Sequence, residues 1–416
     1  MAKNLLGITY DSMFYQLLDG ALKTANFKDA AAFFRDEFAE EMFPDALWKQ
    51  MYPASDESND NGIVTQFYGV NTVPVMASYT AASAEGQLIA NEGFELNQSS
   101  MPTAKLAMRF NEKSFKDGEH LLNNNGIPEY LKIFNSFLKD STDLITGIHS
   151  LRSYTGLQVE STLKFVGNET NNAGGIQGLI IDFSKNVPNI EENTQLAGNF
   201  GKELDGYTPL GKNHDWTKND AYPLGDLQDM AYVYENVKHQ NLENAIFRMS
   251  QHDAHLLYNH PTTKAEVALK ISGYVVDPAN IGMVHVTSAD VNKYLTEILQ
   301  IPAISVEKGY GAVQALDTTT GKMVKKTLQG FESGKVLLRP SGPCGYYAWQ
   351  KPNDMFATSV NPMFITDGEK IGVQQMINTL GKEMFFNAES KGVTVPNNVD
   401  LWLYCDIATS QEEPTT

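Results

Sequence analysis

Three histidines lie close together in the sequence and form its nearest approach to a metal-binding pattern. His252, His255 and His260 fall within nine positions. The first two are three residues apart, so on a helix both imidazoles would reach the same side and could bind one ion. No HExxH motif or second ligand motif accompanies them. The simpler interpretation is that they are partly exposed helix residues near a helix C-terminus, where a protonated imidazole is favourable. We therefore expect no metal site.

Other patterns that could carry catalysis or bind a cofactor are equally incomplete. The glycine-rich stretches Gly174–Gly178 and Gly309–Gly311 lack the spacing of phosphate-binding loops and are interpreted as turns. No GxSxG sequence occurs. Acidic pairs such as Glu191 and Glu192 are expected by chance in a chain with 50 acidic residues. We expect no catalytic residues, no cofactor and no enzymatic activity.

The two cysteines, Cys344 and Cys405, are too few for a disulfide framework or a zinc site with four cysteines. Their most ordinary role is as buried thiols. The first 14 residues lack the basic region and apolar stretch of a secretory signal, and no run approaches the roughly 18 apolar residues of a membrane span. The sequence therefore predicts a soluble protein made in a reducing compartment.

The composition is that of an acidic globular protein. The chain has 416 residues, 32 basic against 50 acidic, and so a formal charge of −18. With 42% hydrophobic and 20% charged residues it is neither a disordered tail nor a fibrous repeat, and its length allows two or three domains. The one basic cluster is Lys322, Lys325 and Lys326, which argues against a protein that grips nucleic acid tightly. Copies of the chain repel one another, so self-assembly must depend on shape and apolar contact.

The N-terminal region is rich in aromatic residues. Phe33, Phe34, Phe38 and Phe43 recur at helix-like spacings up to Pro44. Such a segment is expected to dock either on the core of its own chain or on a neighbouring subunit. The polar run 53–62 marks a boundary after it.

Residues 63–115 have the pattern of a long β-hairpin. Ile63, Thr65 and Phe67 form one β-prone flank and Lys105–Phe110 the other, around a tip of small residues near 80–93. From Pro128 the period changes, and apolar residues recur at every third or fourth position up to Leu151. This pattern predicts a helix over 128–152 that could continue past Gly156 towards Phe165.

The remaining sequence mixes predicted helices and strands. A strand is expected within 176–183, a helix opening at Asp226, a short helix after the Ser250–Asp253 capping box and ending at Pro261, and a helix after Ser288. Further strands are predicted within 271–276, 303–316, 335–342 and 399–408. The regular βαβ alternation of a doubly wound sheet is missing, so the fold class is α+β.

Three segments, 215–261, 299–352 and 393–409, resemble a known family in their order of turns, helices and strands. The matching positions in the first segment are Trp216, Pro223, Asp226, Leu227, Met249, Leu256 and Asn259. Together they resemble the major capsid protein of tailed bacteriophages, with the Hong Kong ninety-seven type fold, and more specifically the lambda-type capsid protein E family. The resemblance covers roughly residues 60–410.

The resemblance implies a mechanical role and a particular division of the chain. It implies an N-terminal arm (1–62), an extended β-hairpin loop (63–115), a peripheral domain with a spine helix (116–185), a mixed and mainly axial domain (186–355), and C-terminal strands and tail (356–416). Many copies would form hexamers and pentamers of an icosahedral phage head that encloses double-stranded DNA without tight binding. Scaffold, portal and cementing proteins are further expected partners. No membrane is expected, and the location would be the virion capsid after assembly in the host cytoplasm.

Aromatic side chains on the two arms are expected to anchor the contacts between subunits. These residues are Phe33, Phe34, Phe38, Phe43, Phe67, Tyr68, Tyr79 and Phe94. Three alternatives stay open: a nanocompartment shell protein, a tail or baseplate protein, and, with least support, a hydrolytic enzyme that uses acid pairs.

Overall fold

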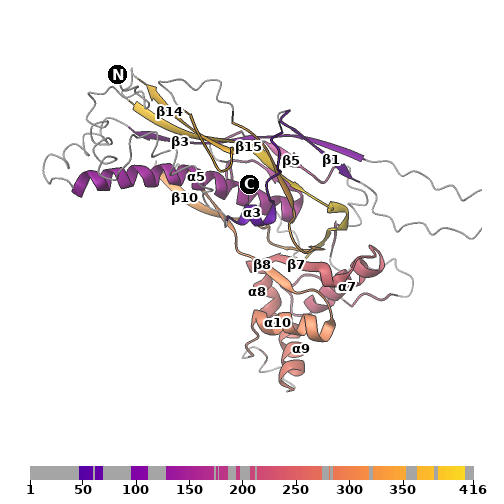
Figure 1. Cartoon of the computed structure of the whole chain (residues 1–416). Coiled ribbons are helices and arrows are strands. Elements are labelled where there is room, and N and C mark those ends of the chain that lie inside the picture. Colours follow the sequence, from indigo (N-terminus) through magenta and orange to yellow (C-terminus); the bar gives the residue numbers. More distant parts are fainter. Residues whose placement is uncertain are drawn as a thin grey trace, which may run out of the picture. The chain divides into compact units, whose positions relative to one another are not determined.

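The chain has an α+β fold in which two compact units are each assembled from separate stretches of sequence. The computed structural model (Figure 1) describes residues 46–59, 61–68, 95–110, 128–172, 175–176, 178–185, 194–196, 207–210, 213–273, 281, 284–317, 322–352, 363–378 and 383–407. The first unit comprises 1–64, 99–153 and 345–395, and the second comprises 65–98, 154–344 and 396–416. The five predicted domain boundaries stay a prediction.

The first unit is built on a five-stranded sheet. Its order is β12 (Gly345–Gln350), β15 (Glu383–Pro396), β14 (Ile371–Asn378) and β13 (Met363–Thr366), with β3 (Thr103–Phe110) also paired to β15. Figure 1 shows β3, β14 and β15 side by side. All three pairings among β3, β15, β14 and β13 are antiparallel. The predicted second flank of the hairpin, Lys105–Phe110, therefore pairs with β15, because a strand's partner depends on tertiary contacts.

The segment before β1 belongs to this unit. In the short helix α3 (Leu47–Met51), Trp48 is fully buried. The polar run that follows lies beside β12: the Tyr347 N–H donates to the Pro53 carbonyl at 2.8 Å, and the Asn59 N–H donates to the Trp349 carbonyl at 2.7 Å. Residues 46–59 thus dock on their own chain, and the predicted boundary loop covers an edge of the sheet.

Helix α5 (Pro128–Thr162) is the predicted long helix, and it begins at Pro128 as expected. Its 35 residues correspond to about 52 Å at 1.5 Å per residue. Gly156 does not end it. Leu144, Ile145 and Ile148 are buried, as the apolar period requires.

The second unit contains another five-stranded sheet with helices around it. The strand order is β6 (Thr194–Leu196), β16 (Leu403–Asp406), β11 (Lys335–Pro340), β7 (Ala245–Ser250) and β8 (Ile304–Glu307). The helices are α7 (Pro223–Asn236), α8 (Gln251–Asn259), α9 (Pro261–Ser272), α10 (Ser288–Lys293) and the π-helix η3 (Tyr294–Leu299). In Figure 1, α8, α9 and α10 gather beside β7 and β8. Apolar side chains from these elements form one buried core that includes Leu227, Phe247 and Leu403.

Several predicted helix boundaries in this unit need correction. Helix α7 begins at Pro223, and Asp226 lies in its first turn rather than at its start. Pro261 ends α8 but also begins α9, since proline is favourable at a first helical position. Helix α9 includes residues 271–272, where a strand was predicted. The cap of α10 is Thr287, one residue before the predicted Ser288.

In the described part of the chain, three pairs of strands lie outside the two large sheets. Strand β1 (Ile63–Tyr68) pairs with β2 (Glu95–Ser100), β4 (Lys164–Val166) with β5 (Ile180–Asp182), and β9 (Tyr310–Asp317) with β10 (Lys322–Gln329). The residues between β1 and β2, including the predicted hairpin tip, lie outside the described part of the chain. The basic cluster lies on β10.

Candidate functional site

A buried network of charged side chains joins helix α5 to the sheet of the second unit. The carboxylate of Glu160 is fully buried, and its Oε1 accepts hydrogen bonds from Arg248 Nε at 2.9 Å and Arg339 Nε at 2.8 Å. Arg248 on β7 lies opposite Leu337 on β11, two residues before Arg339, so both arginines lie on the same face of the sheet. Glu160 therefore fastens α5 to two adjacent strands.

A second carboxylate balances the charges of this network. Glu307 on β8 lies 2.5 Å from Arg248 Nη2. Burial opposes ionisation of Glu160, but the two guanidinium groups hold its pKa below the ordinary value of 4.5. Burial raises the pKa of Glu307, although Arg248 partly offsets it. The Cys344 thiol lies 3.6 Å from Glu160, and burial raises its pKa. Cys344 is therefore a protonated buried thiol rather than a nucleophile.

The first unit contains a different charged cluster. Asp367 accepts hydrogen bonds from Lys49 Nζ at 2.8 Å and Arg152 Nη1 at 3.1 Å. The Arg152 guanidinium carbon lies 4.7 Å from the ring centre of Trp48 and 4.5 Å from that of Tyr347. Two aromatic faces therefore help to stabilise a buried cation.

Trp216 and Asp226, two positions that carry the family resemblance, form a structural contact. Trp216 Nε1 donates to Asp226 Oδ2 at 2.8 Å, and His214 Nδ1 lies 2.7 Å from Asp226 Oδ1. Burial raises the pKa of Asp226, although these hydrogen bonds oppose the shift. The contact ties the segment before α7 to the first turn of that helix.

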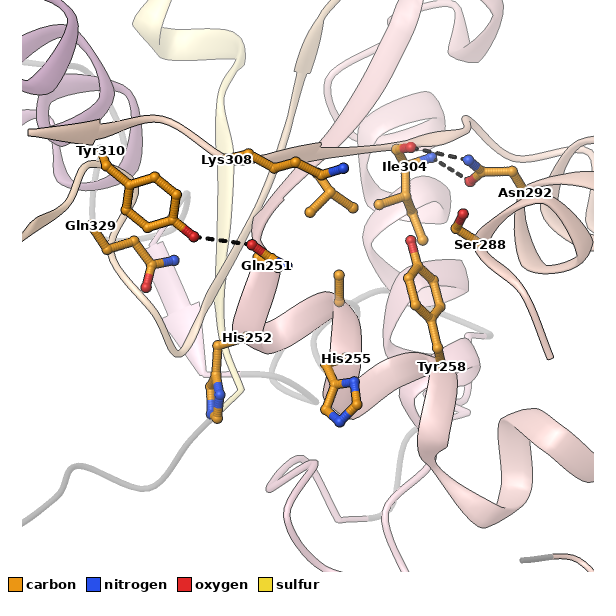
Figure 2. Close-up of a pocket in the computed structure, with 12 residues that line it drawn as sticks. Gln251, His252, His255, Tyr258, Ser288, Asn292, Ile304, Lys308, Tyr310 and Gln329 are labelled. Atoms are coloured by element: carbon orange, nitrogen blue, oxygen red, sulfur yellow. Dashed lines mark hydrogen bonds between the residues drawn. The ribbon is translucent and has the colours of Figure 1, made fainter. Parts of the chain in front are cut away.

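A groove in the second unit is a candidate binding site (Figure 2). Its volume is about 730 Å³, within the range of ligand sites. The groove is lined by Gln251, His252, Ala254, His255, Tyr258, Ser288, Asn292, Ile304, Val306, Lys308, Tyr310 and Gln329. It therefore lies between one face of α8, the start of α10, β8 and the residues that follow β8.

The three histidines do not act together. His252 and His255 line the groove and project from the same side of α8 in Figure 2, whereas buried His260 lies against the Lys218 carbonyl at 2.8 Å. His252 is the second and His255 the fifth of the nine residues of α8, so the predicted position near a helix C-terminus is wrong for them. Within the described ranges, no three side chains of His, Cys, Asp or Glu are grouped as a metal site would require.

The predicted interface residues fall mainly beyond the described part of the chain. Phe33, Phe34, Phe38, Phe43, Tyr79 and Phe94 all lie there. Phe67 and Tyr68 lie on β1, for which the structure describes the backbone at these positions. Both cysteines are free and buried, as predicted.

Sequence reasoning missed both the groove and the Glu160 network. Arg248 and Arg339 lie 88 and 179 positions from Glu160, and no local pattern relates them. The groove had one signal in the sequence, the histidines three residues apart on a helix. Among helices of the described residues, none is both long and apolar enough to cross a membrane.

No family model and no curated protein matches this chain. Solved structures do resemble it. A protein described as a prophage capsid protein of E. coli CFT073 is 13% identical, with 94% of this chain and 99% of that chain covered and a TM-score of 0.43. A phage-related protein of Bordetella bronchiseptica RB50 is 11% identical over 87% and 92% of the two chains, with a TM-score of 0.40. The capsid of Ralstonia phage GP4 is 11% identical over 92% of each chain, with a TM-score of 0.39. The chain is thus similar along most of its length to proteins described as phage-related or as phage capsids.

Proposed function

We propose that this chain is a structural major capsid protein of a tailed bacteriophage. Many copies assemble as hexamers and pentamers into an icosahedral head around double-stranded DNA. Assembly takes place in the host cytoplasm, and the mature location is the virion capsid. The chain acts by contact between subunits and not as an enzyme.

The observation that carries this proposal is the β1–β2 pair. These two strands form a sheet of their own, and residues 69–94 lie between them. A two-stranded ribbon is at best marginally stable in water, so contact with a further surface would stabilise it. A neighbouring subunit in a shell supplies such a surface. The ribbon therefore fits the first part of the extended loop (63–115) that the sequence resemblance implies, whereas β3 at Thr103–Phe110 belongs to the sheet of the first unit.

The positions that carry the sequence resemblance have coherent structural roles. Trp216 donates a hydrogen bond to Asp226, and Pro223 is the first residue of α7. Leu227 and Met249 are fully buried in the core of the second unit. These residues stabilise the body of the subunit, which supports a resemblance in fold rather than in a catalytic motif.

The net charge of −18 restricts how the proposed shell is held together. Because copies repel at long range, contacts between subunits need shape complementarity and apolar area. The acidic surface also keeps DNA from adhering, so DNA is cargo rather than a tightly held ligand. Scaffold, portal and cementing proteins are the further partners of such a head. Within the proposed arm of residues 1–62, residues 46–59 dock on their own unit.

Electron microscopy of the purified chain, alone and with co-encoded scaffold, tests the proposal. We expect closed icosahedral particles. Rings or tubes would favour a tail or baseplate protein, and uniform small shells without nucleic acid would favour a nanocompartment. A monomer that turns over a substrate would overturn the structural role.

A deletion of residues 70–93 tests the ribbon while it retains β1 and β2. We expect a folded subunit, with unchanged circular dichroism, that no longer closes into shells. A variant with these residues replaced by glycine and serine at equal length is the matched control, because it separates chain length from side-chain contacts. Normal particles from the deletion would contradict the assigned role.

A further inference from the structure

Trp48 joins residues 46–59 to the rest of the first unit. It lies on α3 and is fully buried. The centre of its ring system lies 4.9 Å from that of Tyr347 on β12 and 5.8 Å from that of His149 on α5. Its Nε1 lies 2.8 Å from His149 Nδ1. One indole therefore contacts both the long helix and the sheet.

The hydrogen bond between Trp48 and His149 fixes the protonation state of the imidazole. An indole N–H can only donate, so His149 Nδ1 must accept. A neutral imidazole has one nitrogen without a proton, whereas an imidazolium carries a proton on both nitrogens. His149 is only 4% exposed, so water cannot readily replace a lost partner. The docked indole therefore requires a neutral His149, because a proton on Nδ1 would place two N–H groups against each other.

The charged groups around this pair oppose a further proton. Lys49 Nζ lies 5.8 Å from the centre of the indole ring and the Arg152 guanidinium carbon 4.7 Å from it, and both cations pair with Asp367. Arg152 follows His149 by three residues, so both lie on the same side of α5. Tyr347, from β12, adds an uncharged ring. Among the described side chains near the pair, two cations thus face one carboxylate, and a third positive charge is unfavourable there.

The residues that follow α3 bond to the edge of β12. The Ser55 N–H donates to the Tyr347 carbonyl at 3.0 Å, and Trp349 Nε1 donates to the Ser55 carbonyl at 2.9 Å. Further backbone bonds join Pro53 and the strand, as described above. Because α3 leads directly into this run, loss of the Trp48 contact would weaken these bonds and open the edge of β12.

We propose that Trp48 and His149 form a pH-sensitive latch, which holds residues 46–59 on β12 at neutral pH and releases them when His149 gains a proton. Histidine ordinarily takes up this proton at about pH 6.5. Because the docked state requires the neutral imidazole, the stabilising effect of the latch is present above about pH 6.5 and is lost as the pH falls below it. The proposal does not depend on the function proposed above, because all of these residues belong to one unit of a single subunit.

Residue-resolved hydrogen exchange on unassembled subunits at pH 7 and pH 5 tests the latch, with each rate divided by the intrinsic rate of that amide. The Tyr347 and Asn59 amides report release, because each bonds between the docked segment and β12. We expect their normalised rates to be at least about 10-fold higher at pH 5. The Val373 amide on β14, between β13 and β15, is the internal control and should not change. Equal normalised rates of Tyr347 and Asn59 at the two pH values would overturn the proposal.

His149→Asn separates the latch from other effects of acid. The asparagine oxygen is as many bonds from the backbone as Nδ1 is, can accept from Trp48 and does not titrate. We expect this variant to keep residues 46–59 docked and to lose the difference in exchange between pH 7 and pH 5. His255→Asn, at an exposed position on α8, is the matched control and should keep that difference. An undiminished pH response in His149→Asn would show that His149 is not the group that responds.

Trp48→Phe supplies a second, independent variant. Phenylalanine keeps an aromatic ring but has no N–H, so the docked state no longer requires a neutral His149. We expect the Tyr347 amide of this variant to exchange about 10-fold faster than that of the normal chain at pH 7. Between pH 7 and pH 5 its normalised rate should change by less than about 3-fold. A full pH response in Trp48→Phe would overturn the assignment of the latch to this pair.

Discussion

The two units neutralise buried charge in different ways. In the second unit, the carboxylates of Glu160 and Glu307 face the guanidinium groups of Arg248 and Arg339, and opposite charges are equal in number. In the first unit, the single carboxylate of Asp367 faces both Lys49 and Arg152. The cluster of the second unit therefore depends on charge pairing. The cluster of the first unit depends on charge pairing together with aromatic rings.

The difference predicts how each cluster responds to the loss of its acid. Without Glu160, two buried guanidinium groups lose their shared partner, and removal of one member of a buried ion pair is costly. Without the charge of Asp367, Arg152 still lies over Trp48 and Tyr347 and donates to Ser390 Oγ at 2.5 Å. Loss of its buried carboxylate should therefore destabilise the second unit more than the first.

The largest expected effect follows from Glu160→Gln. The neutral amide keeps one acceptor, but it turns an NH₂ group towards the arginines. We expect the free energy of unfolding to fall by about 3–5 kcal/mol. Urea denaturation of the unassembled subunit measures this loss, and hydrogen exchange in β7 and β11 locates it in the second unit.

Glu297→Gln is the matched control for this substitution. Glu297 is 62% exposed and lies 3.9 Å from Lys293, so the same chemical change should alter the stability by no more than about 0.5 kcal/mol. Equal losses of unfolding free energy in the two variants would show that the buried Glu160 network stabilises the chain no more than an exposed ion pair does.

Acid should reduce the difference in stability between the normal chain and the Glu160→Gln variant. Because the folded-state pKa of Glu160 is below its ordinary value of 4.5, its contribution is present above pH 4.5 and is lost as the pH falls through the lowered folded pKa. Urea titrations of both chains from pH 7 to pH 3 measure the difference. A stability difference that does not change with pH would contradict the ionised state assigned to Glu160.

A smaller effect is expected from Asp367→Asn. The amide oxygen can still accept from one of the two cations, and the aromatic rings remain over Arg152. We expect the free energy of unfolding to fall by about 2 kcal/mol, which is typical for the loss of a hydrogen bond to a charged group. Urea denaturation measures it, with exchange in β14 and β15 as the local readout. A larger loss of unfolding free energy for Asp367→Asn than for Glu160→Gln would show that the cluster of the first unit is the more sensitive one.

Local features of this chain were predictable because the interacting residues are neighbours in sequence. The apolar period after Pro128 predicted α5, and the Ser250–Asp253 pattern predicted a cap that the structure confirms, with Ser250 Oγ accepting from the Asp253 N–H at 3.1 Å. Pro261 was ambiguous, because proline both ends one helix and favours the start of the next.

The pairing of strands was not predictable by the same reasoning. The β-prone pattern at Lys105–Phe110 was correct, but its partner is β15, far along the chain. The polar run 53–59 showed no strand signal, yet it bonds along β12, because a strand edge can pair with any backbone that presents N–H and carbonyl groups.

The sequence by itself determined the α+β class, the long helix, the Ser250 cap of α8, the buried thiols and the acidic charge. These properties follow from composition and from spacings within one turn or one strand. Only the tertiary structure decided that Glu160 meets two arginines, that residues 46–59 cover a sheet edge, and that His252 and His255 line a groove together with Ile304 and Val306. Such features depend on residues that are distant in the chain, and hydrophobic periodicity specifies which face of an element is buried but not which partner buries it.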